Sequence, residues 1–334
     1  MYTSYYGLHK NPFDLAPNPS AVFMSESHQE AISVLRYGVI DRKGFLLLTG
    51  DVGTGKTTLL QFFVASFGNR IRYCLISNPT LSVQDFYQTL AEELSLPSPG
   101  GSKARFLQEF KKLLADCQQR DERVILIIDE AHVLPLKLLE EVRLLANQDN
   151  GVGGVLSVFL VGQPELNQRL TDPQLLALRQ RIATRYHLEP FDRDTTVAYI
   201  SFRLRQAGAS RFDLFTAPAL SLIHKASRGV PRVINLICGQ ALLTGFADGR
   251  PVINVGTIRE SIKDLRLPGA GRRLPLPRKS LLAPPAWLFT TRARAMLGAG
   301  LLLSLLLVGG ILWQPEYLQQ TKELLQAARA LVRS

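Results

Sequence analysis

Residues 50–57 read Gly50-Asp51-Val52-Gly53-Thr54-Gly55-Lys56-Thr57 and match the pattern G-x-x-x-x-G-K-[ST] at every fixed position. The apolar run Phe45–Thr49 comes directly before them, and the helical pattern Leu59–Phe67 follows. Glycines let the backbone curl so that its N–H groups face one centre, and a helix N-terminus favours negative charge there. The pattern therefore predicts a strand, a phosphate-binding loop and a helix in this order.

The loop supplies most of the predicted nucleotide contacts. The residues expected to bind ATP are Gly50, Asp51, Val52, Gly53, Thr54, Gly55, Lys56, Thr57 and Thr58. Lys56 should reach the β and γ phosphates, which makes it a catalytic group as well as a binding group. Thr57 should ligate Mg²⁺ through its hydroxyl.

A second acidic element follows the apolar run Val124–Asp129. Asp129 is the predicted partner of Thr57 in the Mg²⁺ site, and Glu130 is the predicted catalytic group that orients and polarises the attacking water. The alternative interpretation is that the two carboxylates only cap a helix that begins near Pro135.

A polar residue follows the next apolar run, Leu156–Gly162. Gln163 should lie between the two phosphate-binding strands and is our candidate for a catalytic sensor of the γ-phosphate or its water. The alternative is an ordinary glutamine in a turn between a strand and a helix.

Three arginines, Arg179, Arg181 and Arg185, lie near the far edge of the same domain. In a ring or filament such arginines reach the γ-phosphate of the neighbouring subunit and stabilise the charge of the transition state. We favour Arg181 for this catalytic role, then Arg185. A solvated or salt-bridging role is the alternative for each of them.

The strand patterns stop after Pro190 and a helical domain is expected. Its predicted helices are Asp192–Ala207, Ala217–Arg228, Pro231–Phe246 and Val255–Leu265. Proline suits the first turn of the third helix. Arg232, next to that proline, should point toward the nucleotide and couple the angle of the helical domain to the γ-phosphate.

The chain as a whole reads as an α/β protein, with a parallel sheet of the P-loop NTPase (AAA+) type covered by helices on both faces and a small helical lid. Its strands, Phe45–Thr49, Arg72–Ser77, Val124–Asp129 and Leu156–Gly162, are nearly all apolar, as expected for such a sheet. The predicted divisions are a nucleotide-binding domain with an N-terminal arm, a lid, a basic Pro/Arg-rich linker, a transmembrane helix and a short extracytoplasmic tail. Their ranges are 1–190, 191–266, 267–294, 295–313 and 314–334.

Composition and charge narrow the class of protein. With 46% hydrophobic and 20% charged residues, the 334-residue chain is neither disordered nor fibrous. Three cysteines have no metal-ligand spacing, and His28 and His132 have no companion at such spacing and are interpreted as structural. The linker and the tail carry most of the net charge of +11 and leave +3 for residues 1–265, so a DNA-binding surface is not required.

Residues 295–313 carry no charge and are long enough to cross a bilayer core of about 30 Å. Basic residues precede this segment, and Trp313 and Tyr317 lie at its other edge, which predicts that the large domain is in the cytoplasm. A buried core helix is the alternative interpretation.

These motifs in this order resemble an AAA+ ATPase of the initiator-like branch. Further residues, namely Tyr6-Gly7-Leu8, Pro12-Phe13, Ser27-His28, Glu30-Ala31, Tyr37-Gly38, the run Gly162–Leu166 and Gln180-Arg181-Ile182, are similar to the general secretion pathway protein A family, which includes ATPases of type IV and MSHA pilus loci. The similarity covers residues 1 to about 265. Longer members carry a periplasmic peptidoglycan-binding domain, which this sequence lacks after the predicted span.

The resemblance implies a single-pass protein of the bacterial inner membrane with ATP and Mg²⁺ as cofactors. Such a protein forms homo-oligomers and supports assembly of a secretion or pilus complex with a membrane partner. The alternative is a nucleotide-switched DNA-binding regulator of the transposition type. The modest charge of residues 1–265 and the apolar segment 295–313 favour the first function, for which nucleic acid is not an expected partner.

Overall fold

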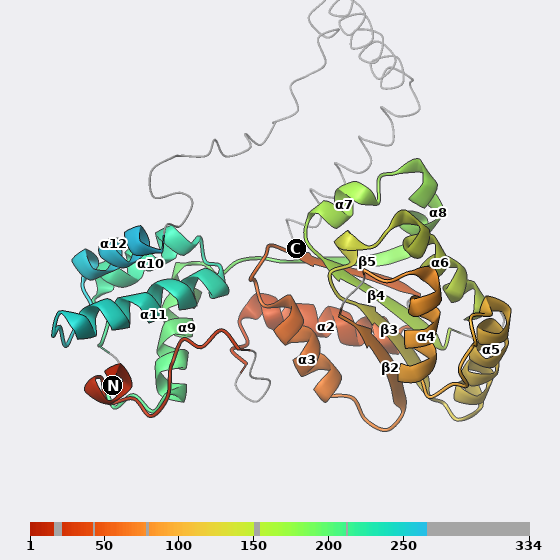
Figure 1. Ribbon diagram of the computed structural model, residues 1–334, viewed down its shortest axis with the longest axis horizontal. Coiled ribbons are helices and arrows are strands. Elements are labelled where there is room, and N and C mark those ends of the chain that lie inside the picture. The colour runs from red at the N-terminus through yellow and green to blue at the C-terminus, as the bar shows by residue number, and fades with distance from the viewer. Residues whose placement is uncertain (17–21, 43, 78–79, 150–153, 212, 266–334) are drawn as a thin grey trace, which may run out of the picture. The chain divides into compact units, whose positions relative to one another are not determined.

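The computed structural model describes residues 1–16, 22–42, 44–77, 80–149, 154–211 and 213–265. The chain divides into two compact units, Met1–Gly271 and Arg272–Ser334. All described residues belong to the first unit, which contains a parallel sheet and a helical domain (Figure 1).

Five parallel strands form one sheet in the order β2-β3-β4-β1-β5. The strands are β1 (Phe45–Gly50), β2 (Ile71–Ile76), β3 (Arg123–Ile128), β4 (Leu156–Gly162) and β5 (Ile182–Leu188). The four strands predicted from apolar runs are confirmed within one residue at each end. Because β4 lies between β3 and β1, the residues that follow it emerge between the two predicted phosphate-binding strands, as expected for Gln163.

The fifth strand was not predicted. β5 lies at the edge of the sheet beside β1, and only Ile182 and Leu188 at its two ends are buried. The residues between them, including the exposed Arg185, face solvent at least in part. An edge strand of this kind has no continuous apolar run, so the pattern that revealed the central strands was absent here.

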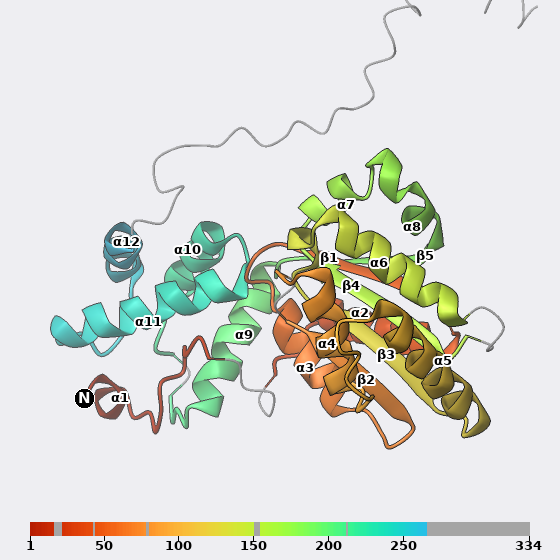
Figure 2. The same ribbon diagram turned by 45° about the vertical axis from the view of Figure 1, so that its right-hand side comes forward.

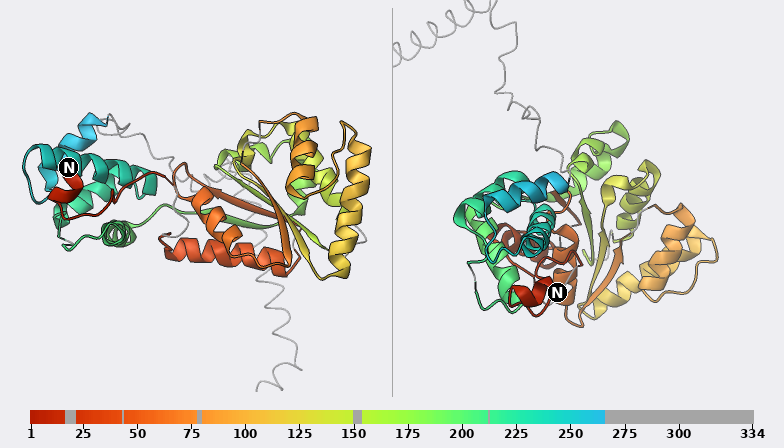
Figure 3. Two further views of the ribbon diagram at one scale, coloured as in Figure 1. Left: turned by 60° about the horizontal axis from the view of Figure 1, so that its bottom comes forward. Right: turned by 60° about the vertical axis from the view of Figure 1, so that its left-hand side comes forward.

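Helices cover both faces of the sheet, as Figures 2 and 3 show. Alternate residues of the central strands enter opposite cores: Val124 and Leu126 pack on one face, while Ile125 and Ile127 pack on the other. The first face is covered by α4 (Val83–Glu93), α5 (Lys103–Gln119), α6 (Leu136–Ala146), the short α7 (Glu165–Arg169) and α8 (Leu176–Arg181). The second is covered by α2 (Glu26–Ile40) and α3 (Lys56–Ala65). Burial on both faces explains why the central strands are apolar throughout.

The helical domain contains the four predicted helices, and each end lies within one residue of its expected position. They are α9 (Arg193–Gln206), α10 (Ala217–Ser227), α11 (Pro231–Ala247) and α12 (Val255–Asp264). Side chains of Asp192, Thr216 and Asn254 accept backbone N–H groups at the starts of α9, α10 and α12, and Pro231 occupies the first turn of α11. These local signals are the ones that set helix starts in general.

The N-terminal arm, residues 1–16, packs on the helical domain and not on the sheet with which we had grouped it. It begins with the short helix α1 (Tyr2–Tyr5), and its buried side chains Tyr6, Leu8 and Phe13 join the core formed by α9 to α12. The Arg203 side chain of α9 donates hydrogen bonds to the carbonyls of Pro12 and Asp14. Because these hydrogen-bond partners are 191 and 189 residues apart in the chain, the local sequence gives no sign of this packing.

The segment predicted to cross the membrane lies outside the described residues. Within the described ranges, no helix combines the length and the apolar character needed to cross a bilayer. The predicted linker 267–294, span 295–313 and tail 314–334 lie outside the described residues.

Phe13→Ala is expected to destabilise the helical domain by about 3–5 kcal/mol, the usual cost of removing a buried phenylalanine side chain. Phe13 is buried and its ring packs edge-on against Phe215, with centroids 6.1 Å apart. Urea unfolding of the full chain in detergent measures the change. Ile40→Ala, at an exposed position, is the control and should change stability little; equal effects of the two substitutions would contradict the placement of the arm.

Candidate nucleotide-binding site

The loop between β1 and α3 requires glycine at two positions. Gly53 and Gly55 have φ angles of +83° and +100°, a region that other residues rarely adopt. Gly55 is the residue before the first turn of α3, so the loop ends directly at a helix N-terminus. The strand, loop and helix predicted from residues 45–67 are therefore present in that order, with backbone N–H groups available for an anion.

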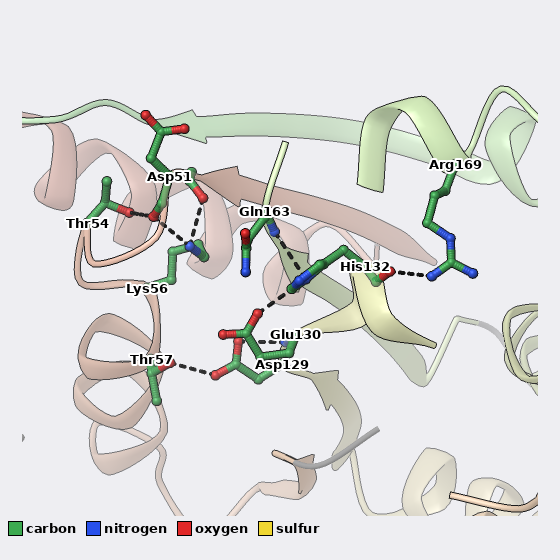
Figure 4. Close-up of polar contacts among 10 residues, drawn as sticks. Asp51, Thr54, Lys56, Thr57, Asp129, Glu130, His132, Gln163 and Arg169 are labelled. Carbon is green, nitrogen blue, oxygen red and sulfur yellow. Dashed lines mark hydrogen bonds and ion pairs between the residues drawn. The ribbon is translucent and has the colours of Figure 1, made fainter. Parts of the chain in front are cut away.

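The ammonium group of Lys56 lies over the loop. Its Nζ donates hydrogen bonds to the carbonyls of Gly50, at 2.7 Å, and Asp51, at 2.9 Å (Figure 4). The side chain is buried, and this burial lowers its pKa, while the nearby carboxylates of Glu130 and Asp129 oppose the shift. The cation is thus held at the place where phosphate oxygens would enter.

The two predicted metal ligands meet. Thr57 Oγ1 donates a hydrogen bond to Asp129 Oδ2 at 2.7 Å, which joins the start of α3 to the end of β3. Asp129 Oδ1 accepts the backbone N–H of Glu130 at 2.9 Å. The alternative capping role of the acidic pair is not what the structure shows, since among the described residues no side chain caps α6 at Pro135.

The donor set fits Mg²⁺. Thr57 and Asp129 offer oxygen atoms, and Glu130 Oε2 nearby is a buried oxygen without a hydrogen-bond partner among the described residues. Within the same ranges, no group of three or more His, Cys, Asp or Glu side chains could hold a metal by itself. Mg²⁺ is usually bound by one or two protein oxygens together with phosphate and water, so this arrangement suits it.

A cavity of ≈ 460 Å³ adjoins the loop. This volume is in the usual range for small-molecule sites. Its lining comes from the arm and the segment after it (Asp14, Leu15, Ala16, Val22, Phe23, His28), from the loop, α3 and the end of β3 (Val52, Gly53, Thr54, Gly55, Lys56, Thr57, Thr58, Glu130), and from the helical domain and the segment that leads to it (Phe191, Tyr199, Arg203, Pro231, Arg232, Asn235). Gly50 and Asp51 contribute their carbonyls to Lys56 just beside it.

The aromatic part of this lining was missed in the sequence analysis. The ring of Phe23 packs against those of Phe191 and Tyr199, with centroids 5.6 and 5.5 Å apart. Phe23 and Phe191 lie in connecting segments without a helical or strand pattern. The sequence marks Phe191 only as an apolar residue after Pro190 in the link between the domains, and Phe23 only as an apolar residue before α2.

The helical domain touches the loop directly. The backbone N–H of Arg232 donates to the Gly53 carbonyl at 3.3 Å, and a Cβ atom on Gly53 would lie 2.7 Å from Arg232 Cβ. Gly53 is therefore needed for this close approach as well as for its φ angle. Arg232 lies in the lining of the cavity, as predicted, and Arg203 is a second arginine there.

His132 and His28, which were interpreted as structural, both lie beside the predicted site residues. His132 Nδ1 lies 3.2 Å from Glu130 Oε2 and 3.5 Å from the backbone nitrogen of Gln163, so Glu130, His132 and Gln163 lie together beyond the sheet (Figure 4). His28 lines the cavity, with its Nδ1 2.6 Å from Ser25 Oγ and a hydrogen bond to the Thr54 backbone. Neither contact follows from spacing along the chain.

The three arginines predicted to reach the nucleotide of a neighbouring subunit lie outside the lining of the cavity. Arg179 and Arg181 belong to α8, where Arg181 donates to the carbonyl of Arg143 at 3.4 Å, and the exposed Arg185 belongs to β5. Within the described ranges, none of the three lines the cavity of its own chain.

The chain is similar in sequence to known AAA proteins. The profile of the AAA domain family matches residues 40–170. General secretion pathway protein A of Aeromonas hydrophila is 42% identical over 260 residues, which cover 77% of this chain and 47% of that protein, so the chain spans about half the length of this relative.

Solved structures show the same fold. Drosophila ORC bound to DNA has a TM-score of 0.59 at 17% identity, covering 76% of this chain and 64% of that one. Cdc6p from Pyrobaculum aerophilum has a TM-score of 0.56 at 19% identity, covering 76% and 70%. At these identities the likeness concerns the α/β AAA fold.

His28 predicts an acid-sensitive contribution to stability. The residue is only 4% exposed, and burial lowers its pKa to about 4 from an ordinary value near 6.5. Between these values the unfolded chain binds the proton that the folded chain rejects, so stability falls as the pH is lowered from about 6.5 to about 4, by about 3 kcal/mol. His28→Gln should lose this part of the pH dependence in urea unfolding at several pH values. His9→Gln, at an exposed histidine, should keep the wild-type slope, and an unchanged slope in His28→Gln would contradict the assignment.

Proposed function

Since the chain belongs to the AAA proteins of the general secretion pathway protein A family, we propose that it binds ATP with Mg²⁺ beside the P-loop and hydrolyses it to ADP and phosphate. The observation that carries this proposal is the hydrogen bond between Thr57 and Asp129, next to the ammonium of Lys56 and the carboxylate of Glu130. These are the groups that a phosphoryl-transfer site needs, and they come from the start of α3 and from the residues that follow β3.

Each group has a distinct role in the proposed reaction. Lys56 exchanges its carbonyl contacts for phosphate oxygens and neutralises their charge. Glu130 orients a water and accepts its proton, while Gln163 contacts the γ-phosphate or that water. Bound at Thr57 and Asp129, Mg²⁺ would supply further charge neutralisation. Arg232 links the position of the helical domain to the phosphates, because its backbone already contacts Gly53.

Hydrolysis is proposed to support assembly of a secretion or pilus complex at the bacterial inner membrane. The identity to general secretion pathway protein A supports this role. The uncharged residues 295–313 would anchor the chain as a single span, with the ATPase domain in the cytoplasm and a membrane protein of the same system as partner. The short tail 314–334 would lie on the outer side.

Glu130→Gln should bind ATP as the wild type does but lower its turnover about 10²–10⁴-fold, because an amide cannot accept the proton of the water. Steady-state phosphate release and nucleotide binding by the full-length protein in detergent measure the two effects. Glu109→Gln, on α5 away from the cavity, serves as the control with normal turnover. Wild-type turnover in Glu130→Gln would show that Glu130 is not the base.

A shared site predicts that specific activity rises with protein concentration, because Arg181 of one copy would complete the site of another. Arg181→Ala and Lys56→Ala should each be inactive alone. Their mixture should recover part of the activity, since Lys56→Ala still supplies the arginine and Arg181→Ala still binds ATP. Arg105→Ala, at an exposed arginine of α5, should remain active. A flat concentration dependence with no recovery on mixing would contradict action in trans.

A further inference from the structure

Glu130 has an unusual backbone that directs it out of its strand. Its φ angle is +52°, a left-handed conformation that non-glycine residues seldom adopt, and its N–H is held by the Asp129 carboxylate at 2.9 Å. The turn then continues as a short 3₁₀ helix, Ala131–Val133. The local backbone therefore sets the direction of the Glu130 side chain, and its carboxylate lies beside the side chain of His132.

The His132 ring is positioned to hold one oxygen of this carboxylate. Its side chain is 15% exposed, compared with 41% for that of Glu130, and its Nδ1 lies 3.2 Å from Oε2. Although this distance permits a hydrogen bond, Oε2 has no partner with hydrogen-bond geometry among the described residues. A small rotation of either side chain would supply the bond, because both atoms are already within reach.

The same nitrogen also faces the sensor segment. The backbone N–H of Gln163 points to His132 Nδ1 at 3.5 Å, the outer limit of a hydrogen bond. A Cβ atom on Gly162 would lie 3.1 Å from the backbone nitrogen of His132 and 3.3 Å from its Nδ1. The imidazole is thus packed closely against the end of β4, so a displacement of Gln163 changes its surroundings directly.

One nitrogen cannot satisfy both neighbours at once. An N–H donor such as Gln163 needs a lone pair on Nδ1, whereas the Glu130 carboxylate needs a proton there. Nδ1 carries either the lone pair or the proton, so the two contacts exclude one another. Both distances lie at or beyond the middle of the hydrogen-bond range, as expected if neither contact is fully made in this arrangement.

Arg169 keeps the ring in this place. Its guanidinium donates to the backbone carbonyl of His132 (Figure 4). It also donates to the backbone carbonyl of Leu134, and the two bonds tie α7 to the turn after β3. Gln163 and Arg169 belong to the same short segment after β4. The segment that carries the sensor and the turn that carries Glu130 are therefore joined at two points, one through Nδ1 and one through the guanidinium.

From this geometry we propose that His132 is a positioning residue for Glu130. In one state its Nδ1 contacts the backbone N–H of Gln163, and in the other state Nδ1 contacts the carboxylate of Glu130. When Gln163 engages the phosphate end of the nucleotide and its N–H leaves Nδ1, the neutral ring changes tautomer: Nε2 gives its proton to water and Nδ1 takes one from water. The Nδ1–H then donates to Oε2 and holds the carboxylate in place for water activation. This inference rests on the proposed ATP hydrolysis by way of Glu130.

The test measures single-turnover ATP hydrolysis and ATP affinity in the full chain for three substitutions. His132→Ala should lower the hydrolysis rate roughly 10- to 100-fold, less than the loss of the base itself, and should leave the dissociation constant for ATP within about twofold of the wild type. His132→Asn, whose amide occupies the position of Nδ1, should recover much of the rate. His132→Gln, whose amide occupies the position of Nε2, should not, and Val133→Ala on the same turn is the control with normal activity.

A double-substitution cycle separates this role from simple packing. If His132 acts through Glu130, His132→Ala should cause no further loss in a Glu130→Gln background. An equal further loss there, or a matching loss of ATP affinity, would overturn the inference. A wild-type rate in His132→Ala while Glu130→Gln is stalled would also overturn it and would leave the proposed hydrolysis standing. Wild-type turnover in Glu130→Gln would instead overturn the proposed hydrolysis.

Discussion

The hydrogen bond from Thr57 Oγ1 to Asp129 Oδ2, at 2.7 Å, joins two residues 72 positions apart. Thr57 lies in α3, which follows β1, and Asp129 follows β3, and these two strands are not neighbours in the sheet. It can form because β1, β4 and β3 run parallel, so that their carboxyl ends lie at the same edge of the sheet. Lys56, Glu130 and Gln163 share that edge for the same reason. The apolar cores on the two faces of the sheet hold the strands in this alignment, so the position of the site residues depends on the packing of both cores.

The helical domain and the N-terminal arm turn this edge into a cavity. Arg203 fastens the arm to α9, and the N-terminus of α11 contacts the loop through Arg232 and Gly53. A nucleotide in the cavity would therefore touch the sheet, the arm and the helical domain at once. Binding there favours conformations in which these parts are close, and loss of the γ-phosphate would weaken that preference. Such a change is the means by which the proposed hydrolysis could act on an assembly partner.

Much of this could be predicted from residues whose signals are local. The P-loop, the four apolar strands and the helices α9 to α12 each depend on a few neighbouring residues, and the structure has them within one residue of the expected ends. β5 was missed because an edge strand lacks an apolar run, and the packing of Phe13 on α9 to α12 was missed because its partners are distant in the sequence. The contact between His132 and Glu130 was missed because it depends on the left-handed turn at Glu130, which composition and periodicity do not reveal.

The proposed function requires, above all, that the loop around Lys56 binds nucleotide. Calorimetric titration of the full chain with ATP in the presence of Mg²⁺, compared with Lys56→Ala, tests it directly. The account predicts one ATP per chain for the wild type and no measurable binding for Lys56→Ala, since the buried ammonium is the group that faces the phosphates. Equal affinity of the two proteins would contradict it.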